Sequence, residues 1–261
     1  MRQLHKAVLS PSSQAPSIPN LWSALSSRGI SLRVGEVSMI CGRPSTGKSM
    51  VALNLAYRAQ VPTLYVSADS HMATQSIRLL SLMTGQPQSE LEAMLMQSKQ
   101  EASDLLRSQS YLRWSFLSSP TAAQIQELVE AHAEMWGEGP MLLIVDNLTD
   151  VVRDGGDEWG KEFLKDMKFM ARKWNLAALV LHHMSLSRSH PDGTVPPMEA
   201  IQGKTAETPA LVLSVTTNDG WLGIGAVKNR YGYMDASGHN VDWFEFDPTR
   251  AWIGEAANVD A

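Results

Sequence analysis

The sequence has one cysteine and no long apolar run. Cys41 stands alone among 261 residues, so no disulfide can form within the chain. No apolar run approaches the roughly 18 residues that a membrane helix needs, and residues 1–20 contain no apolar signal core. These absences predict a cytoplasmic protein that does not enter a membrane, with Cys41 as a buried structural thiol.

The chain also lacks an excess of basic residues. Its formal net charge is -5 and its pI is about 5.8. This balance excludes a protein coated with cations, so any contact with nucleic acid must be confined to a groove or a channel. With 44% hydrophobic and 19% charged residues, the chain is long enough for one large α/β domain.

The most informative motif is residues 42–49, which fit the phosphate-binding pattern G-x-x-x-x-G-K-[ST]. An apolar run at 37–41 predicts a strand before it, and residues 50–57 predict a helix after it. Glycines let the backbone amides and the helix N-terminus point at phosphates, while Lys48 reaches the outer phosphates and Ser49 ligates Mg²⁺. We therefore predict that ATP phosphates are bound by Gly42, Arg43, Pro44, Ser45, Thr46, Gly47, Lys48, Ser49 and Met50.

Acidic residues end two further predicted strands. Residues 63–67 predict a strand, and Asp69 follows two residues later. A carboxylate there is well placed to act as the general base on an attacking water. Capping of the helix that follows is an equal alternative for Asp69. The apolar run at 141–146 ends at Asp146, the expected second ligand of the magnesium ion, with Asn147 and Asp150 as possible assistants.

A pair of histidines ends the next buried strand, which is predicted at 176–181. His183 is expected to contact the γ-phosphate and to report hydrolysis to the loop that follows. Metal binding by His182, His183 and His190 is the rival interpretation, but adjacent residues on a strand point to opposite faces.

The segment 185–208 is rich in serine, proline and glycine and is too long for an idle connection. It predicts a mobile loop that binds single-stranded DNA through Arg188, His190 and Lys204, with plain disorder as the alternative.

The last part of the chain predicts antiparallel strands. Runs at 209–215 and 221–227 flank an Asn-Asp-Gly turn, a strong hairpin signal, and β-structure is expected again at 241–246 and 251–253. Lys228 and Arg230 follow the second run on the same face of the chain, so they can deliver two cations to one phosphate.

Helices are predicted between the strands. Capping boxes at 89–92 and 121–124 open helices that run to about 107 and 136, with a strand at 111–117 between them. Apolar positions at helical spacing predict a third helix near 159–174. His132 falls within an apolar stripe and is expected to be packed. Residues 1–20 read as a flexible arm before an ATPase domain at 21–261.

Taken together, residues 42–49, the strand ends at Asp146 and His183, and the run 228–232 resemble the ATPase domain of DnaB-type replicative helicases, within the RecA-like family. The resemblance covers about residues 21–253. It implies a RecA-like fold with a mainly parallel central sheet flanked by helices, and ATP with Mg²⁺ as ligands. It also implies a hexameric ring or helical filament in which Lys228 and Arg230 act on a neighbouring subunit's nucleotide.

The chain departs from this family in three respects. The family's catalytic acid is usually glutamate, whereas Asp69 is one methylene shorter, and the sensor is often glutamine rather than histidine. The separate N-terminal domain of bacterial replicative helicases is not seen, which favours a compact phage or mobile-element protein. The expected function is an ATP-dependent DNA helicase; a RecA-like recombinase and a regulatory ATPase that acts on protein partners are the alternatives.

Overall fold

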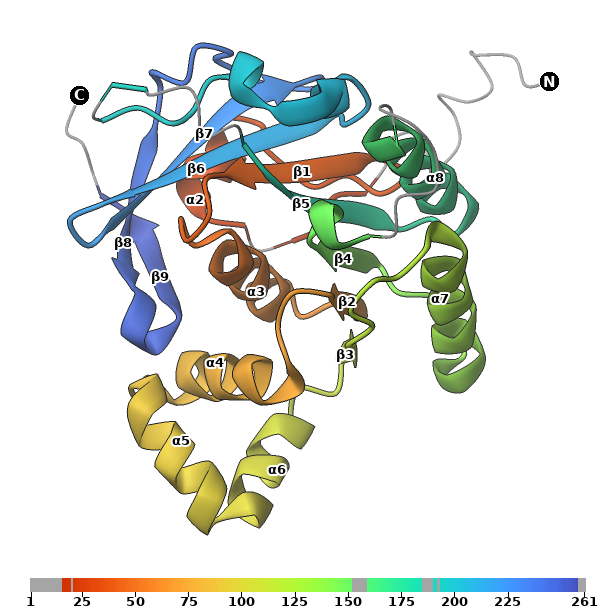
Figure 1. The fold of residues 1–261 in the computed structure, drawn as a ribbon, viewed down its shortest axis with the longest axis vertical. Helices are drawn as coiled ribbons and strands as arrows, with labels where there is room; N and C mark the ends of the chain where they lie inside the picture. The colour runs from red at the N-terminus through yellow and green to blue at the C-terminus, as the bar shows by residue number, and fades with distance from the viewer. Residues whose placement is uncertain (1–15, 20, 152–158, 185–189, 192, 258–261) are drawn as a thin grey trace.

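The computed structural model describes residues 16–19, 21–151, 159–184, 190–191 and 193–257, without the side chains of residues 202–204. These residues form one sheet of nine strands with helices on both faces (Figure 1). The strand order is β3-β2-β4-β5-β1-β6-β7-β8-β9. The first six strands in sequence are mutually parallel and the last three run antiparallel. The α/β architecture predicted from the sequence is confirmed.

The parallel strands are β1 (Val37–Gly42), β2 (Thr63–Ser67), β3 (Leu112–Ser115), β4 (Leu142–Asp146), β5 (Ala177–His183) and β6 (Leu211–Asn218); the antiparallel strands are β7 (Trp221–Asn229), β8 (Asp242–Asp247) and β9 (Trp252–Ala256). The α-helices are α2 (Ser23–Ser27), α3 (Lys48–Ala59), α4 (Met72–Thr84), α5 (Gln88–Gln97), α6 (Lys99–Arg107), α7 (Ala122–Trp136) and α8 (Trp159–Lys173). Short 3-10 turns are η1 (Leu148–Asp150), η2 (Met198–Ala200), η3 (Gln202–Glu207) and η4 (Pro248–Arg250).

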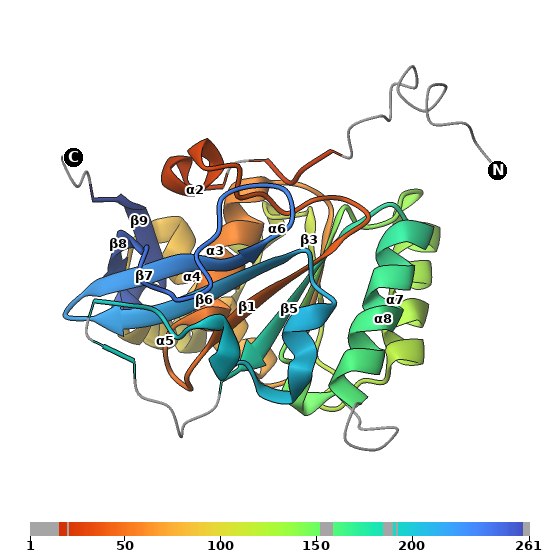
Figure 2. The same ribbon diagram turned by 90° about the horizontal axis from the view of Figure 1, so that it is seen from above.

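Alternation along the strands divides the core into two layers. In β1, Ile40 packs with the residues of α2 and α3, whereas Met39 and Cys41 pack with those of α7 and α8. Both faces of the central strands β1, β2, β4 and β5 are buried, which explains why these strands read as mainly apolar runs rather than as alternating ones. Figure 2 shows α7 and α8 side by side at one side of the sheet, away from α2 and α3.

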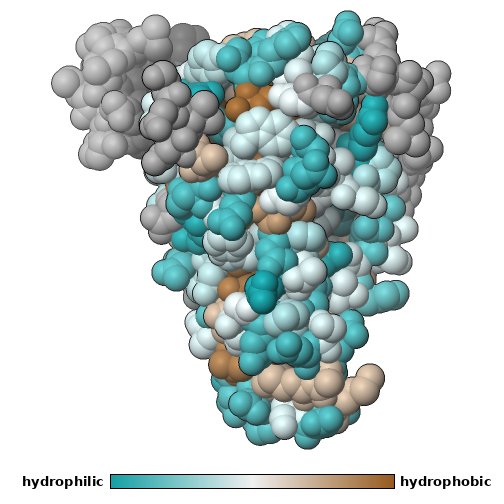
Figure 3. Space-filling model, turned by 90° about the vertical axis from the view of Figure 1, so that its left-hand side faces the viewer, coloured by the Kyte–Doolittle hydropathy of each residue, from teal (hydrophilic) through white to brown (hydrophobic). Residues whose placement is uncertain are grey.

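Helices α4, α5 and α6 form the end of the molecule that lies farthest from β7 in Figure 1. They have a small core of their own, made of Leu80, Leu91 and Ala102. In the view of Figure 3 the molecule narrows toward this end, and hydrophobic side chains are scattered among hydrophilic ones. Among the described residues, no helix is long and apolar enough to cross a membrane.

The predicted helix from 89 to about 107 is wrong as a single element. It breaks at Ser98 into α5 and α6, and α5 begins at Gln88 after Pro87 without a side-chain cap. Proline at that position fixes the backbone dihedral and ends the preceding turn, so the helix starts before Ser89 can cap it. The capping box at Thr121 and Gln124 is present as predicted.

The second half of the segment 185–208 is packed, which differs from the expected mobile loop. Val195, Ala200 and Ile201 are buried, Val195 N donates to Gly238 O at 2.9 Å, and Met184 bridges to Ile201. Three apolar side chains in a polar stretch are enough to dock it on the sheet. Of the predicted arm, Ile18 is buried in the core, and residues 1–15 lie outside the described residues.

Asn54 ties the phosphate-loop helix to the C-terminal strands. It is 2% exposed, its Nδ2 donates to Ala251 O at 2.8 Å, and its Oδ1 accepts from Ile253 N at 3.3 Å. Replacing it with alanine would leave both backbone groups buried without a partner.

We predict that Asn54→Ala lowers the free energy of unfolding by about 2 to 3 kcal/mol, because unpaired buried polar groups each cost about 1–3 kcal/mol. Urea unfolding measures this loss. Gln97→Ala, at an exposed position on α5, is the control and should change little. A loss below about 0.5 kcal/mol, the usual scale for surface substitutions, would contradict the structural role given to Asn54.

Candidate active site

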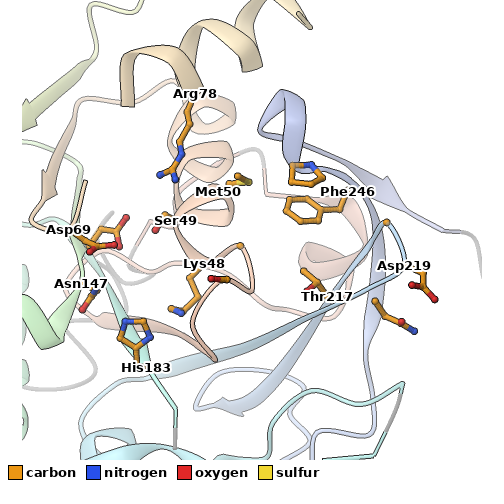
Figure 4. Close-up of a pocket in the computed structure, with 16 residues that line it drawn as sticks. Lys48, Ser49, Met50, Asp69, Arg78, Asn147, His183, Thr217, Asp219 and Phe246 are labelled. Atoms are coloured by element: carbon orange, nitrogen blue, oxygen red, sulfur yellow. The ribbon is translucent and has the colours of Figure 1, made fainter. Parts of the chain in front are cut away.

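The carboxyl ends of the parallel strands meet at one edge of the sheet, and the candidate site lies there. Gly42 pairs with His183 across β1 and β5, and Ser67 pairs with Asp146 across β2 and β4. Ligands bind at this edge in open α/β sheets. A pocket of about 590 Å³ lies over it, lined by residues from the phosphate loop, α4, the ends of β4, β5 and β6, and β8 (Figure 4).

The phosphate loop has the tight backbone that its glycines allow. Gly47 has φ +81° and begins α3, and Ser45 also has a positive φ of 63°. A Cβ on Gly42 would lie 2.6 Å from the Thr46 hydroxyl, so no larger residue fits there. Residues Ser45, Gly47, Lys48, Ser49 and Met50 line the pocket, while Gly42, Arg43, Pro44 and Thr46 shape the turn beneath it.

Lys48 is buried at the base of the pocket. It is 6% exposed, and its Nζ donates to Arg43 O at 2.8 Å and to Gly42 O at 3.2 Å. Burial lowers the pKa of Lys48, and the nearby Asp146 carboxylate opposes that shift. An ammonium held in a desolvated loop attracts an anion more strongly than one in water.

Asp146 ends β4 beside the phosphate loop and is 2% exposed. Burial raises the pKa of its carboxyl, while hydrogen bonds from Ser49 and Tyr65 counteract that shift. The Tyr65 hydroxyl donates to Asp146 Oδ2 at 2.9 Å. Ser49 and Asp146 are thus neighbours at one point of the pocket, as expected for residues that share a magnesium ion.

Asp69 and His183 flank this pair. Asp69 is exposed and lines the pocket, whereas α4 begins at Met72 with His71 before it, so Asp69 is not the helix cap. His183 faces the pocket from the end of β5, and His182 is buried, 3% exposed. Among the described residues no group of three or more His, Cys, Asp or Glu is placed to hold a metal, which speaks against the histidine site.

Arg78 is a further residue of the pocket that the sequence does not predict. This residue lies on α4 and points into the pocket opposite Lys48 and Ser49 (Figure 4). Its Nη1 is buried and makes no hydrogen bond within the described residues. A single arginine in an amphipathic helix carries no sequence signal of its own, because its direction depends on how α4 packs.

The other end of the pocket is different in character. Phe246 from β8 lies there with Met50, and Thr217 and Asp219 lie at the turn between β6 and β7 (Figure 4). The Phe246 ring packs close to Gly47: a Cβ atom added to this glycine would lie 3.2 Å from the ring. This end therefore combines an aromatic ring with polar side chains, whereas the other end carries Lys48 and Arg78. Such a division fits the two parts of a nucleotide, the base and the phosphates. Met50 is among the residues predicted from the sequence to bind ATP. Phe246 is not, because the alternation in β8 predicts only a strand.

Lys228 and Arg230 lie at the opposite edge of the sheet from their own phosphate loop. Arg230 N donates to Ala210 O at 2.8 Å, and Ala210 N donates to Val37 O at 2.8 Å, so Arg230 neighbours the start of β1. The phosphate loop follows the end of β1, about 17 Å away at about 3.3 Å per residue. Lys228 Nζ donates to Ala206 O at 2.6 Å. The structure therefore does not bring these two cations into the pocket of the same chain.

The three residues predicted to bind DNA are described unequally. Arg188 lies outside the described residues, and so does the side chain of Lys204, whose backbone belongs to η3. His190 is partly buried. DNA binding by these residues stays a prediction.

Comparison with known proteins identifies the family. Residues 28–189 match the model of the AAA domain. The chain belongs to the AAA-domain family. It is 33% identical over 241 residues to the Gene 65 protein of Mycobacterium phage L5, which covers 88% of this chain and 89% of that protein. It is 28% identical over 204 residues to the mouse DNA repair protein RAD51 homolog 4, covering 74% of this chain and 58% of that protein.

Solved structures share the fold of this AAA-domain chain. One solved ATPase domain superposes with a TM-score of 0.80 at 12% identity, covering 97% of this chain and 95% of that one. A DnaB-like replicative helicase superposes with a TM-score of 0.78 at 12% identity, covering 97% and 65%. The predicted RecA-like fold of DnaB type is confirmed, and the chain is a P-loop NTPase domain.

His183 makes stability depend on pH. Burial and then the charge of Lys48 lower the pKa of His183 from its ordinary 6.5. As the pH falls through 6.5, the unfolded chain takes up a proton that the native chain resists, so this residue's contribution to stability is lost on acidification. We predict that His183→Gln reduces the fall in unfolding free energy between pH 7.5 and 5.5. Urea unfolding across that range measures it, His71→Gln is the exposed control, and an unchanged pH profile would contradict the prediction.

Proposed function

We propose that this chain is an ATP-driven motor of the DnaB type, which hydrolyses ATP between neighbouring copies and acts on single-stranded DNA. The proposal rests mainly on one observation. The pocket lies at the carboxyl ends of the parallel strands, whereas Lys228 and Arg230 lie at the opposite ends of the strands and cannot reach the pocket of the same chain. The fold shared with a solved ATPase domain and with a DnaB-like replicative helicase supports the same assignment.

The residues present fit ATP and Mg²⁺. The Nη1 of Arg78 is a buried donor without a hydrogen-bond partner in the described part of the chain, and Arg78 points into the pocket, as a site for anionic phosphates requires. Ser49 and Asp146 offer two oxygens that would hold Mg²⁺, an ion that commonly takes few protein ligands and completes its shell with phosphate and water. When bound, the ion supplies positive charge that offsets the charge of the phosphate oxygens.

Within one chain, the proposed roles follow from position. Lys48 and the loop amides bind the phosphates, and Phe246 packs against the base. Asp69 accepts a hydrogen bond from the attacking water and orients it. Arg78 offsets charge that develops on the transferred phosphoryl group, and His183 contacts the same group from β5.

The site is completed between copies. Lys228 and Arg230 of one copy approach the nucleotide of the next, where cations of this kind contribute to the transition state. Such a head-to-tail contact uses different surfaces on the two partners, so it forms a ring or a helical filament rather than a symmetric pair. Hydrolysis is then coupled to movement of single-stranded DNA, with the segment 185–208 as the contact.

The principal test is the steady-state rate of ATP hydrolysis with and without single-stranded DNA. We expect single-stranded DNA to raise the rate of ATP hydrolysis. Lys48→Ala should lower the rate to the background measured without enzyme, because the phosphates lose their buried cation. An unchanged rate in Lys48→Ala would show that ATP is not hydrolysed in this pocket and would overturn the site assignment. Turnover indifferent to DNA would favour an ATPase that acts on protein partners, and DNA-bound filaments without unwinding would favour a recombinase, which the RAD51-like relative also suggests.

Arg78 gives a second prediction. Arg78→Ala should lower kcat by about 10²-fold or more, the usual loss when a donor to developing charge is removed, while binding of a fluorescent ADP analogue changes little. Arg78→Lys should restore part of the rate. Arg107→Ala, an exposed arginine on α6, is the matched control. A wild-type kcat in Arg78→Ala would exclude Arg78 from the chemistry.

A further inference from the structure

Several cations surround one carboxylate at the edge of the sheet opposite the nucleotide pocket. Glu36 lies in the turn before β1, and its side chain is 12% exposed. The Tyr231 hydroxyl donates to Glu36 Oε1 at 3.0 Å. Lys168 lies 3.4 Å from the Glu36 carboxylate, and Arg172 and Arg230 each lie 3.8 Å from it. We call Glu36 with these four residues the Glu36 corner.

The backbone of Arg230 is fixed at this corner, but its side chain is not. Hydrogen bonds link Arg230 N to Ala210 O and Ala210 N to Val37 O, each at 2.8 Å, so Arg230 is tied to the residue that follows Glu36. The side chain beyond is 43% exposed. The only ion pair of Arg230 among the described residues is the one with Glu36. Glu36 is thus the group that selects a direction for the guanidinium.

Glu36 is itself held in place. Its backbone N donates to Arg33 O at 3.2 Å. The Arg33 guanidinium lies 4.6 Å from the centre of the Tyr231 ring, and Tyr231 N donates to Asn229 Oδ1 at 3.0 Å. Both the turn that carries Glu36 and the tyrosine that donates to it are therefore anchored, and the carboxylate is a fixed point rather than a mobile one.

The balance of charge at the Glu36 corner keeps Arg230 available. One carboxylate faces three cations, so the corner retains net positive charge. An ion pair at 3.8 Å on an exposed side chain is weak and is readily displaced. The phosphates of a bound nucleotide can therefore replace Glu36 as the partner of the Arg230 guanidinium. Until then, the Glu36 carboxylate limits the orientation of that guanidinium.

We propose that Glu36 is a positioning residue for Arg230: it holds the guanidinium toward the face that meets the nucleotide of a neighbouring copy. This inference rests on the proposed function, in which Arg230 acts in the neighbour's site. Preorientation matters because an arginine that must first find its direction loses rate in each turnover, whereas one held near its working position does not.

Glu36→Gln tests the inference, because it removes the charge and keeps the shape. We expect kcat for ATP to fall about 3- to 5-fold, the scale set by a weak ion pair on an exposed side chain, with KM and oligomeric state unchanged. Glu36→Asp should retain part of the rate. Glu162→Gln is the matched control, since it removes the carboxylate that pairs with Lys165 on the same helix as Lys168 and should leave kcat unchanged.

Mixing subunits separates positioning from a folding defect. Lys48→Ala chains have a defective pocket and an intact Glu36 corner, and Glu36→Gln chains have the reverse. In mixed oligomers, some interfaces combine the intact corner of a Lys48→Ala chain with the intact pocket of a Glu36→Gln chain. Turnover of the mixture should therefore exceed that of either variant alone. A misfolded Glu36→Gln chain gains nothing from mixing, and that result would overturn the proposal.

Arg230→Ala distinguishes this inference from the proposed function. Slow turnover in Arg230→Ala together with wild-type turnover in Glu36→Gln would overturn the positioning role and leave the proposed function standing. Wild-type turnover in Arg230→Ala would overturn both. A Glu36→Gln chain faster than the wild type would show that Glu36 restrains Arg230, which also contradicts the proposal.

Discussion

The site depends on one carboxyl group, that of Asp146, which is buried at the end of β4. Asp146 is 2% exposed at the end of β4, and burial of an unpaired charge there would cost several kcal/mol. Two hydroxyls compensate, from Ser49 on the phosphate-loop helix and from Tyr65 on β2. The Tyr65 ring in turn stacks on Trp114 of β3, with ring centres 4.5 Å apart. Hydrogen bonds to this one carboxyl group therefore link the phosphate-loop helix, β4 and β2, and the ring contact of Tyr65 adds to the backbone pairing of β2 with β3.

A parallel sheet also gives the chain two chemically different edges. All the strands that carry nucleotide residues end at one edge, and β7, which runs the other way, ends at the opposite one. The pocket gathers carboxylates and Lys48 in a partly enclosed space, whereas the Glu36 corner presents cations to solvent. Because a strand is rigid over about 17 Å, no rearrangement of side chains joins the two edges within one copy. Under the proposed function, the reversal of direction at β7 is the reason that Lys228 and Arg230 act on the nucleotide of a second copy.

Much of this was accessible from the sequence. All nine strands were predicted, because buried parallel strands read as apolar runs and the antiparallel ones alternate. Asp69, Asp146 and His183 were each predicted to act at the bound nucleotide, because each follows an apolar run, and all three line the same pocket. Arg78 and Phe246 were not found, because their directions are set by how α4 and β8 pack. The break at Ser98 left no mark in the helical pattern either, since α5 and α6 are both polar.

The network behind Asp69 explains how a short acid can be placed. Ser67 Oγ donates to Ser70 O at 3.0 Å and accepts from Gln75 Nε2 at 3.0 Å, and Ala68 N donates to Asp146 O at 2.7 Å. The turn that carries Asp69 is therefore bound both to β4 and to the first turn of α4. Aspartate lacks one methylene of glutamate, a reach of about 1.5 Å. If Asp69 has the proposed role, the position of its backbone must therefore compensate for the shorter side chain. Because α4 also carries Arg78, the same hydrogen bonds place the acid and the arginine relative to each other, and any shift of α4 moves both.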